Sequence, residues 1–142
     1  MYVYDILAGK GDRVVTIAPD ATIQELAALL LAERIGAAIV QGHDDTVAGV
    51  ISERDVVGGL ARHGTRCLDM AVRDLMTELV IYCTPGMPIE EVMDLMTERR
   101  VRHLPVVEND RLAGIVSIGD AVKARIAQFE REAQDLRQYI SA

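Results

Sequence analysis

Short apolar runs alternate with helical apolar spacing along this chain, and the same order of elements occurs twice. The β-branched runs 14–17 and 80–83 predict one strand each. Apolar residues then recur at intervals of three and four in 23–33 and in 89–99, which predicts a helix after each strand. This repeated order indicates an internal duplication.

Two short strands are predicted after each helix. The apolar runs 37–40 and 47–51 flank one polar loop, and 104–107 and 112–116 flank another. Both loops are too short for a parallel crossover, so we expect each pair of strands to be antiparallel. Thr22 is a suitable cap for the first helix.

The duplication is also visible residue by residue. The segment 47–55 recurs as 112–120, and the lead-in segment 3–7 recurs as 72–76. Two copies of so small a unit cannot each bury a hydrophobic face alone, so we expect them to pack together. A cleft between two similar halves is a natural place for a ligand.

The pattern divides the chain into a first repeat with its lead-in at 1–66, a second repeat at 67–126 and a helical extension at 127–142. The last helix carries apolar residues at steps of four and three: Val122, Ile126, Phe129, Ala133, Leu136 and Ile140. This heptad seam continues beyond the repeat. It favours docking onto a partner subunit over a helix that folds back on its own domain.

Composition narrows the class of protein. The 142 residues are 50% hydrophobic and only 4% aromatic, which indicates an aliphatic core. A net charge of −7 weighs against general binding to nucleic acid or anionic membranes. No apolar run approaches the roughly 20 residues of a membrane helix, and the N-terminus lacks the order of a signal peptide. Cys67 and Cys83 fit no paired spacing, so we expect reduced thiols in a cytoplasmic protein.

The most informative short element is Gly-h-h-Ser-x-x-Asp, where h is apolar, at 49–55 and again at 114–120. One interpretation is structural, because a serine can cap the following helix while the aspartate bonds back to a backbone N–H. The other is functional. A helix N-terminus attracts phosphate, and a carboxylate there can accept both hydroxyls of a ribose.

Two such units in tandem resemble the cystathionine-β-synthase (CBS) domain. The residues that carry the resemblance are the segments 72–76, 102–107, 49–55 and 114–120, and the Ser-Glu-Arg-Asp of 52–55 is especially typical. The resemblance extends from Val3 to about residue 126. It implies an α/β (α+β) fold of two β-α-β-β-α repeats related by a pseudo-twofold axis, with two clefts.

The resemblance also implies a function and a set of contacts. CBS pairs are regulatory modules that bind adenosine-containing ligands, often as dimers. By analogy, Asp55 and Asp120 would hold ribose hydroxyls, and Ser52, Ser117 and the Ile118 N–H would face ribose or phosphate. The adenine would lie against the strands before and after each first helix, at Thr16, Ile17, Ala37, Ala38, Tyr82, Thr84, His103, Leu104 and Pro105.

The two copies differ in charge. Arg102 and His103 stand where the first copy has small residues, and Arg54 has only a glycine as its counterpart. Arg102 and His103 suit a phosphate, although they can equally be an exposed pair at the start of a strand. These differences favour one good site centred on Asp120, with the Asp55 site weaker or empty.

We expect AMP as the ligand, with NAD(H) or ATP next and ADP also possible, and we expect no catalytic cofactor and no metal. A hydrolase is the lesser alternative, because Gly-x-Ser-x-Gly is absent and both serines stand at helix caps. The cluster 43–45 is more simply a solvated turn than a metal site. A ligand-free scaffold is the third alternative. Partners are expected to be a second copy in a homodimer, through the last helix, and an unidentified regulated protein.

Overall fold

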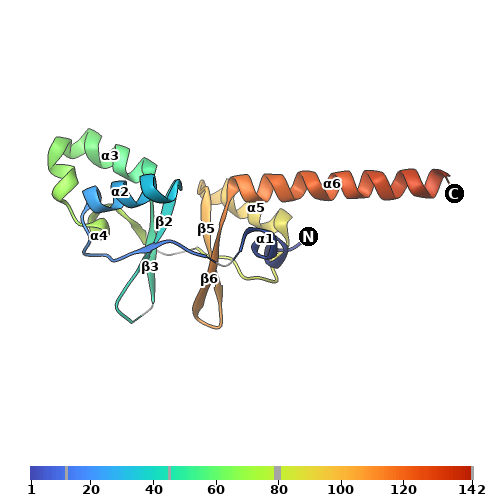
Figure 1. Ribbon diagram of the computed structural model, residues 1–142, viewed down its shortest axis with the longest axis horizontal. Helices are drawn as coiled ribbons and strands as arrows, with labels where there is room; N and C mark the ends of the chain where they lie inside the picture. The colour runs from blue at the N-terminus through green and yellow to red at the C-terminus, as the bar shows by residue number, and fades with distance from the viewer. Residues whose placement is uncertain (12, 45, 79–80, 142) are drawn as a thin grey trace.

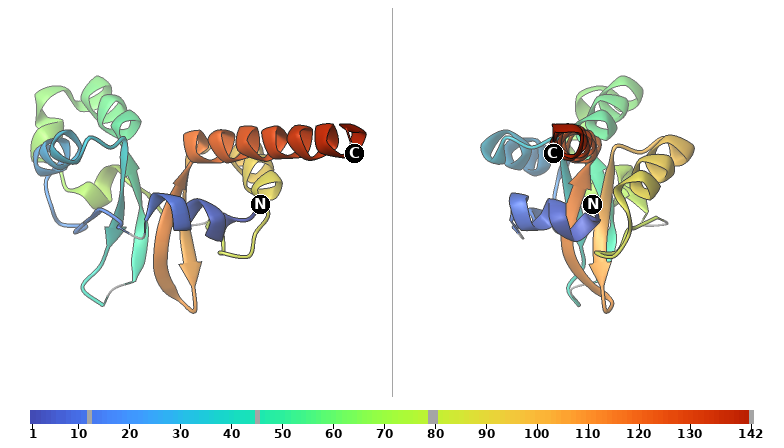
Figure 2. Two further views of the ribbon diagram at one scale, coloured as in Figure 1. Left: turned by 45° about the vertical axis from the view of Figure 1, so that its right-hand side comes forward. Right: turned by 90° about the vertical axis from the view of Figure 1, so that its right-hand side faces the viewer.

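Two similar halves lie side by side in the computed structural model, which describes residues 1–11, 13–44, 46–78 and 81–141 (Figure 1). Each half is a β-hairpin flanked by helices, and a long C-terminal helix extends away from the second half. Figure 2 shows this helix free of the rest of the molecule over its outer part. The expected α+β class with tandem repeats and an extended last helix is confirmed.

The first half contains a four-stranded sheet in the order β1-β2-β3-β4. Its elements, with the two short helices that follow α3, are β1 (Thr16–Ile17), α2 (Ile23–Glu33), β2 (Ala37–Gln41), β3 (Val47–Ser52), α3 (Glu53–His63), the 3-10 helix η1 (Gly64–Asp69), α4 (Val72–Leu75) and β4 (Thr77–Glu78). The β1–β2 pair is parallel, and the β2–β3 pair is antiparallel. The Thr22 side chain accepts a bond from the Glu25 N–H, so the expected cap is confirmed.

The second half is built around an antiparallel hairpin. Its elements, with the N-terminal helix that packs on it, are α1 (Val3–Lys10), α5 (Ile89–Arg99), β5 (His103–Glu108), β6 (Arg111–Ser117) and α6 (Ile118–Ser141). Asn109 and Asp110, both with positive φ, form the tight turn between β5 and β6. The expected antiparallel pairs and both first helices are therefore confirmed.

The strands expected before each first helix are shorter than predicted. Of 14–17, only Thr16 and Ile17 pair in the sheet. In the second half Cys83 forms a single parallel bridge with Val106, and Val80 lies outside the described residues. A two-residue parallel ladder thus places this segment beside β2 in the first half, and a single bridge places its counterpart beside β5 in the second.

Each half has its own aliphatic core. Ile23, Leu26 and Ile51 are fully buried in the first, and Ile89 and Leu104 are almost completely buried in the second. Both cysteines are free and buried, and burial raises the pKa of the Cys83 thiol to about 12. That thiol is therefore a core residue and not a nucleophile at neutral pH.

The two lead-in segments are exchanged between the halves. Val3 and Ile6 of α1 are buried in the core of the second repeat, whereas Cys67 and Val72 are buried in the core of the first. Backbone hydrogen bonds fix the exchange, from the Tyr4 N–H to Pro85 O and from the Arg73 N–H to Pro19 O, both close to 3 Å. The division of the chain at 66/67 stays a prediction about the order of segments. In three dimensions each lead-in packs in the half formed by the other repeat.

The glycine that opens each Gly-h-h-Ser-x-x-Asp segment makes room for the exchanged lead-in. A Cβ at Gly49 would lie 2.3 Å from the Thr77 carbonyl oxygen, and a Cβ at Gly114 would lie 2.6 Å from a Leu7 methyl carbon. The first obstacle is backbone and the second is the end of a flexible side chain. The glycines are therefore required by close packing against the exchanged lead-ins and not by a positive φ.

We predict that Gly49→Ala destabilises the protein by about 1–3 kcal/mol, because the methyl group would have to displace the backbone of β4. Gly86→Ala is the matched control, since a Cβ there meets nothing within 4 Å. Urea unfolding followed by circular dichroism measures both variants. Equal stability of the two variants would contradict the tight crossing at Gly49.

Within the described residues, no helix has the length and apolar character needed to cross a bilayer.

Candidate functional site

A cavity of about 330 Å³ lies between the two halves. Its volume is within the range of small-ligand pockets, which starts near 300 Å³. Segments from both repeats form its walls. The lining residues are Gly36, Val50, Ser52, Glu53, Arg54, Asp55, Thr77, Glu78, Ile81, Arg100, Val101, Arg102, His103, Leu104 and Pro105.

The first wall is the junction of β3 and α3. Glu53 donates its backbone N–H to Gly36 O, which holds the start of the helix against β2. Asp55 Oδ2 accepts hydrogen bonds from the Ser52 N–H at 2.9 Å and from Ser52 Oγ at 3.2 Å. Within the described ranges Oδ1 of Asp55 accepts none, so one carboxylate oxygen stays available at a helix N-terminus.

The second wall is the segment that leads from α5 into β5. Arg100 ends α5 in the left-handed conformation at φ 55°, and Val101 donates its N–H back to Met96 O. Arg100 and Arg102 are exposed at the cavity, and Arg54 is exposed on the opposite wall. Among the described residues none of these three guanidinium groups forms an ion pair. The cavity therefore has three cations available for an anionic ligand.

His103 is a neutral member of this wall. Burial lowers its pKa below the usual value near 6.5, and the nearby charge of Lys10 lowers it further, while Asp120 acts in the opposite direction. At neutral pH the imidazole accordingly carries no charge and offers one hydrogen-bond donor and one acceptor. The cations of the cavity are its three arginines, and Glu53, Asp55 and Glu78 bring an equal number of carboxylates to the lining.

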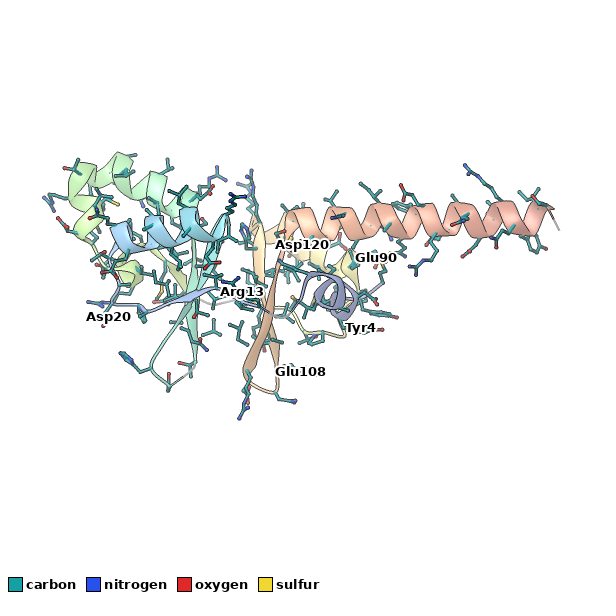
Figure 3. The ribbon with its side chains drawn as sticks, in the orientation of Figure 1. Tyr4, Arg13, Asp20, Glu90, Glu108 and Asp120 are labelled. Carbon is teal, nitrogen blue, oxygen red and sulfur yellow. The ribbon has the colours of Figure 1, made fainter. Side chains whose placement is uncertain are left out.

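The second motif occupies a different environment. Figure 3 shows Asp120 where α6 leaves β6. Its Oδ2 accepts a bond from the Ser117 N–H at 2.9 Å, and Ser117 Oγ accepts one from the Asp120 N–H at 3.0 Å. Lys10, at the end of α1, donates to Asp120 Oδ2 at 2.6 Å and to Ile115 O at 3.0 Å. The carboxylate that matches Asp55 is thus paired with a lysine of the exchanged lead-in.

This contact changes the titration of Asp120. Partial burial would raise its pKa, but the hydrogen bonds from Lys10 and from the Ser117 backbone outweigh burial and lower the pKa below its usual value. A carboxylate with a lower pKa in the folded state stabilises the fold above its unfolded pKa of about 3.9. That stabilisation is lost as the pH falls through the folded pKa.

We predict that Lys10→Met reduces the dependence of stability on pH in the acid range. The free energy of unfolding of the wild type should fall more steeply than that of the variant between about pH 5 and pH 2, because only the wild type has the Lys10–Asp120 pair. Thermal unfolding at a series of pH values measures this. Parallel curves for the two proteins would contradict the assignment.

The structure brings together one group of the residues singled out in the sequence. Those that line the cavity are Ser52, Arg54, Asp55, Arg102, His103, Leu104 and Pro105. The sequence grouped Arg102 and His103 with Asp120. His103 does lie opposite Ser117 in the β5–β6 pair. Arg102 and His103 nevertheless line the cavity that contains Asp55.

The remaining candidates lie outside this lining. Ser117, Ile118 and Asp120 gather at the Lys10 contact, where the Ile118 N–H is already bonded to Arg102 O. Ala37 and Ala38 are buried in the first half. The others, exposed or half-buried on the strand segments before α2 and α5, are Thr16, Ile17, Tyr82 and Thr84.

Sequence reasoning missed Lys10, Arg100 and the Thr77–Glu78 edge of the cavity. Glu78 and Lys10 follow the two lead-ins, so their places depend on the exchange, which no local pattern reveals. Arg100 had a signal in the sequence, because it follows the last helical residue as Arg34 does in the first copy. Of these two arginines, only Arg100 lines the cavity.

The residues considered for catalysis do not gather. No histidine is hydrogen-bonded to Ser52 or Ser117 within residues 1–11, 13–44, 46–78 and 81–141. In the same ranges no three His, Cys, Asp or Glu side chains form a group suited to a metal. Asp44 accepts a bond from Thr46 Oγ1 in a turn, and Asp45 lies outside the described residues.

Comparison with known families agrees with this architecture. The family model described as "CBS domain" matches residues 4–62 and again 72–127. The chain therefore belongs to the CBS-domain family, and it carries two copies of the domain. The matched ranges leave the outer part of α6 outside the family pattern.

Relatives with the same fold come from several organisms. The CBS-domain containing protein ATU1752 of Agrobacterium tumefaciens is 46% identical, with a TM-score of 0.85, over 87% of this chain and 92% of that one. The mitochondrial CBS domain-containing protein CBSX3 of Arabidopsis thaliana is 34% identical over 85% of this chain. The chain spans 61% of the length of that relative.

A more distant structure shares the fold alone. The CBS domain pair of MJ0100, solved in complex with 5′-methylthioadenosine and S-adenosyl-L-methionine, is 23% identical with a TM-score of 0.80. It covers 90% of this chain and 98% of its own.

Proposed function

We propose that this protein is a non-catalytic regulatory module that binds an adenosine-containing ligand in the cavity between its two CBS repeats. The observation that carries the proposal is the opposition of Asp55, at the start of α3, to Arg100 and Arg102 across the cavity. A carboxylate accepts both hydrogen bonds of a ribose diol, and guanidinium groups with a helix N-terminus bind phosphate.

The apolar part of the lining suits the base. Leu104 and Pro105 at the start of β5 offer an apolar surface beside the cations, with Val50 and Ile81 on other walls. AMP is the favoured ligand, since its ribose and its phosphate match Asp55 and the arginines of this cavity. NAD(H) or ATP come next and ADP after them, with the adenosine part held in the same place. The adenosine compounds bound to the MJ0100 pair support this class of ligand through the shared fold.

The Asp120 cleft is proposed as a second and weaker site. The charge differences in the sequence favour Asp120, but Arg102 and His103 line the cavity of Asp55, and Lys10 occupies the Asp120 carboxylate. A ribose at Asp120 would have to displace this lysine. Asp55 therefore takes the place of Asp120 as the primary site.

We predict that AMP binds to the wild type and that Asp55→Ala weakens binding at least tenfold, because two hydrogen bonds to a charged acceptor are lost. Asp120→Ala is the matched control in the other repeat and should change this affinity little. Isothermal titration calorimetry measures both. The reverse order of effects would place the primary site at Asp120.

Arg102→Ala separates the phosphate contact from the ribose contact. This variant should bind AMP more weakly and adenosine almost as the wild type does, whereas Asp55→Ala should weaken both. Release of phosphate or base from the bound nucleotide would instead indicate an enzyme. Absence of saturable binding by AMP, NADH and ATP would indicate a scaffold.

We predict that Lys10→Met increases the number of AMP molecules bound per chain toward two, because it frees Asp120 Oδ2 from its ion pair. The methionine keeps most of the apolar length of the lysine, so α1 should stay packed on the second half. Equilibrium dialysis at saturating AMP gives the stoichiometry. An unchanged value of one would show that Lys10 is not what limits the second cleft.

The output of binding is proposed to pass to an unidentified regulated protein or through a homodimer. We further propose a cytoplasmic location, since both thiols are free.

A further inference from the structure

One face of α6 is apolar and exposed along most of its length. Val122, Ile126 and Phe129 are 40%, 53% and 52% exposed, and Leu136 and Ile140 are 59% and 74% exposed. With Ala133 they follow the steps of four and three that align along one side of a helix. They form the apolar seam of α6, and they are exposed both beside the body and beyond it.

The body of the molecule contacts a different side of α6. Ala121 is buried and Ala124 packs against the core of the second half. Arg125 forms an ion pair with Glu90 of α5 and lies over the Phe129 ring, 4.3 Å from its centre. The seam is therefore exposed at the same level where a neighbouring side of α6 packs on the body.

The outer part of α6 has no packing of its own. Every described residue from Phe129 to the end of the helix is exposed, and Figure 1 shows this part extending away from both halves. An isolated helix of about 12 residues is marginal in water, because most helical stability in proteins comes from packing. A partner on the seam would supply that packing.

We propose that the seam binds the seam of a second copy of this chain in a parallel, in-register, two-stranded coiled coil. The heptad places Val122, Phe129 and Leu136 at position d and the other three at position a. The proposal is independent of the ligand site, since it rests on the helix alone.

The flanking charges select this arrangement. In a parallel pair the residue at g faces the residue at e of the next heptad in the other helix. Arg125 then faces Glu130 of the second copy, and Glu132 faces Arg137 of the second copy. All of these contacts join opposite charges. The helix is thus complementary to itself, as a twofold interface requires.

The antiparallel pair with full overlap joins like charges instead. There e faces e and g faces g, so Glu130 meets Glu130 of the second copy and Glu132 meets Glu132. Lys123 would also face Arg137. Since Arg125 already has Glu90 as a partner, the Glu132–Arg137 contacts carry most of the preference.

Cysteine crosslinking of the full chain tests the register. Ala133→Cys at position a should give a covalent dimer under mild oxidation, because only the parallel in-register pair brings residue 133 against itself. Gln134→Cys, on the adjacent outward face, is the control and should stay monomeric. The two natural cysteines are buried and do not interfere. No crosslink at 133, or equal crosslinking at 134, would overturn the proposal.

Charge reversal tests the complementarity. Arg137→Glu should raise the dimer dissociation constant, measured by sedimentation equilibrium, about tenfold, because two attractive contacts become repulsive. The double variant Glu132→Arg/Arg137→Glu should restore it. In an antiparallel pair, by contrast, Arg137→Glu alone would bring opposite charges together at Lys123 and lower the dissociation constant. A monomeric wild type, or a dimer that is indifferent to Arg137→Glu, would also overturn the proposal.

Discussion

The crossing of the two lead-in segments holds this molecule together. Each repeat lacks part of its own core, and the missing part comes from the segment that precedes the other repeat in the chain. Symmetric backbone bonds, to Pro85 O on one side and Pro19 O on the other, fix the crossing. Gly49 and Gly114 leave the space through which the exchanged segments pass. Neither half is therefore a complete folding unit.

The same crossing makes the two clefts different. The second lead-in continues past Gly49 into Thr77 and Glu78, which form one edge of the open cavity. The first lead-in ends at Lys10, whose ammonium group lies on Asp120. Two nearly identical motifs consequently meet different neighbours, an open space with three arginines in one case and a lysine in the other. The asymmetry comes from what the lead-ins carry and from Arg54 and Arg102, each of which has a glycine as its counterpart in the other copy.

The local sequence pattern was sufficient to predict the helices and strands. It was insufficient to predict which residues come together at the site. The apolar spacing of 23–33 and 89–99 gave both helices to the residue, and loop length gave the antiparallel pairs. Seven of the fifteen residues that line the cavity were named from the sequence, since Ser52, Asp55 and Arg102 belong to recognisable segments. The grouping of these residues around one cavity was not predicted, because it depends on which half each segment packs against. Periodicity describes one element at a time and contains no information on an exchange between two halves.

The position of Asp120 links the second cleft to the outer helix. Asp120 lies in the first turn of α6, the helix whose far end carries the exposed seam. The first two turns of α6 are held on the body by Ala121 and by the Arg125–Glu90 pair. A ligand that displaces Lys10 would change the contacts of this anchored end alone. Such a ligand can move the outer part of α6 only if it binds one placement of the anchored turns more tightly than another. A ligand with equal affinity for both placements does not shift the equilibrium between them. Any influence on assembly of a ligand bound at Asp120 accordingly requires movement of α6 against α5, and not a change within the seam.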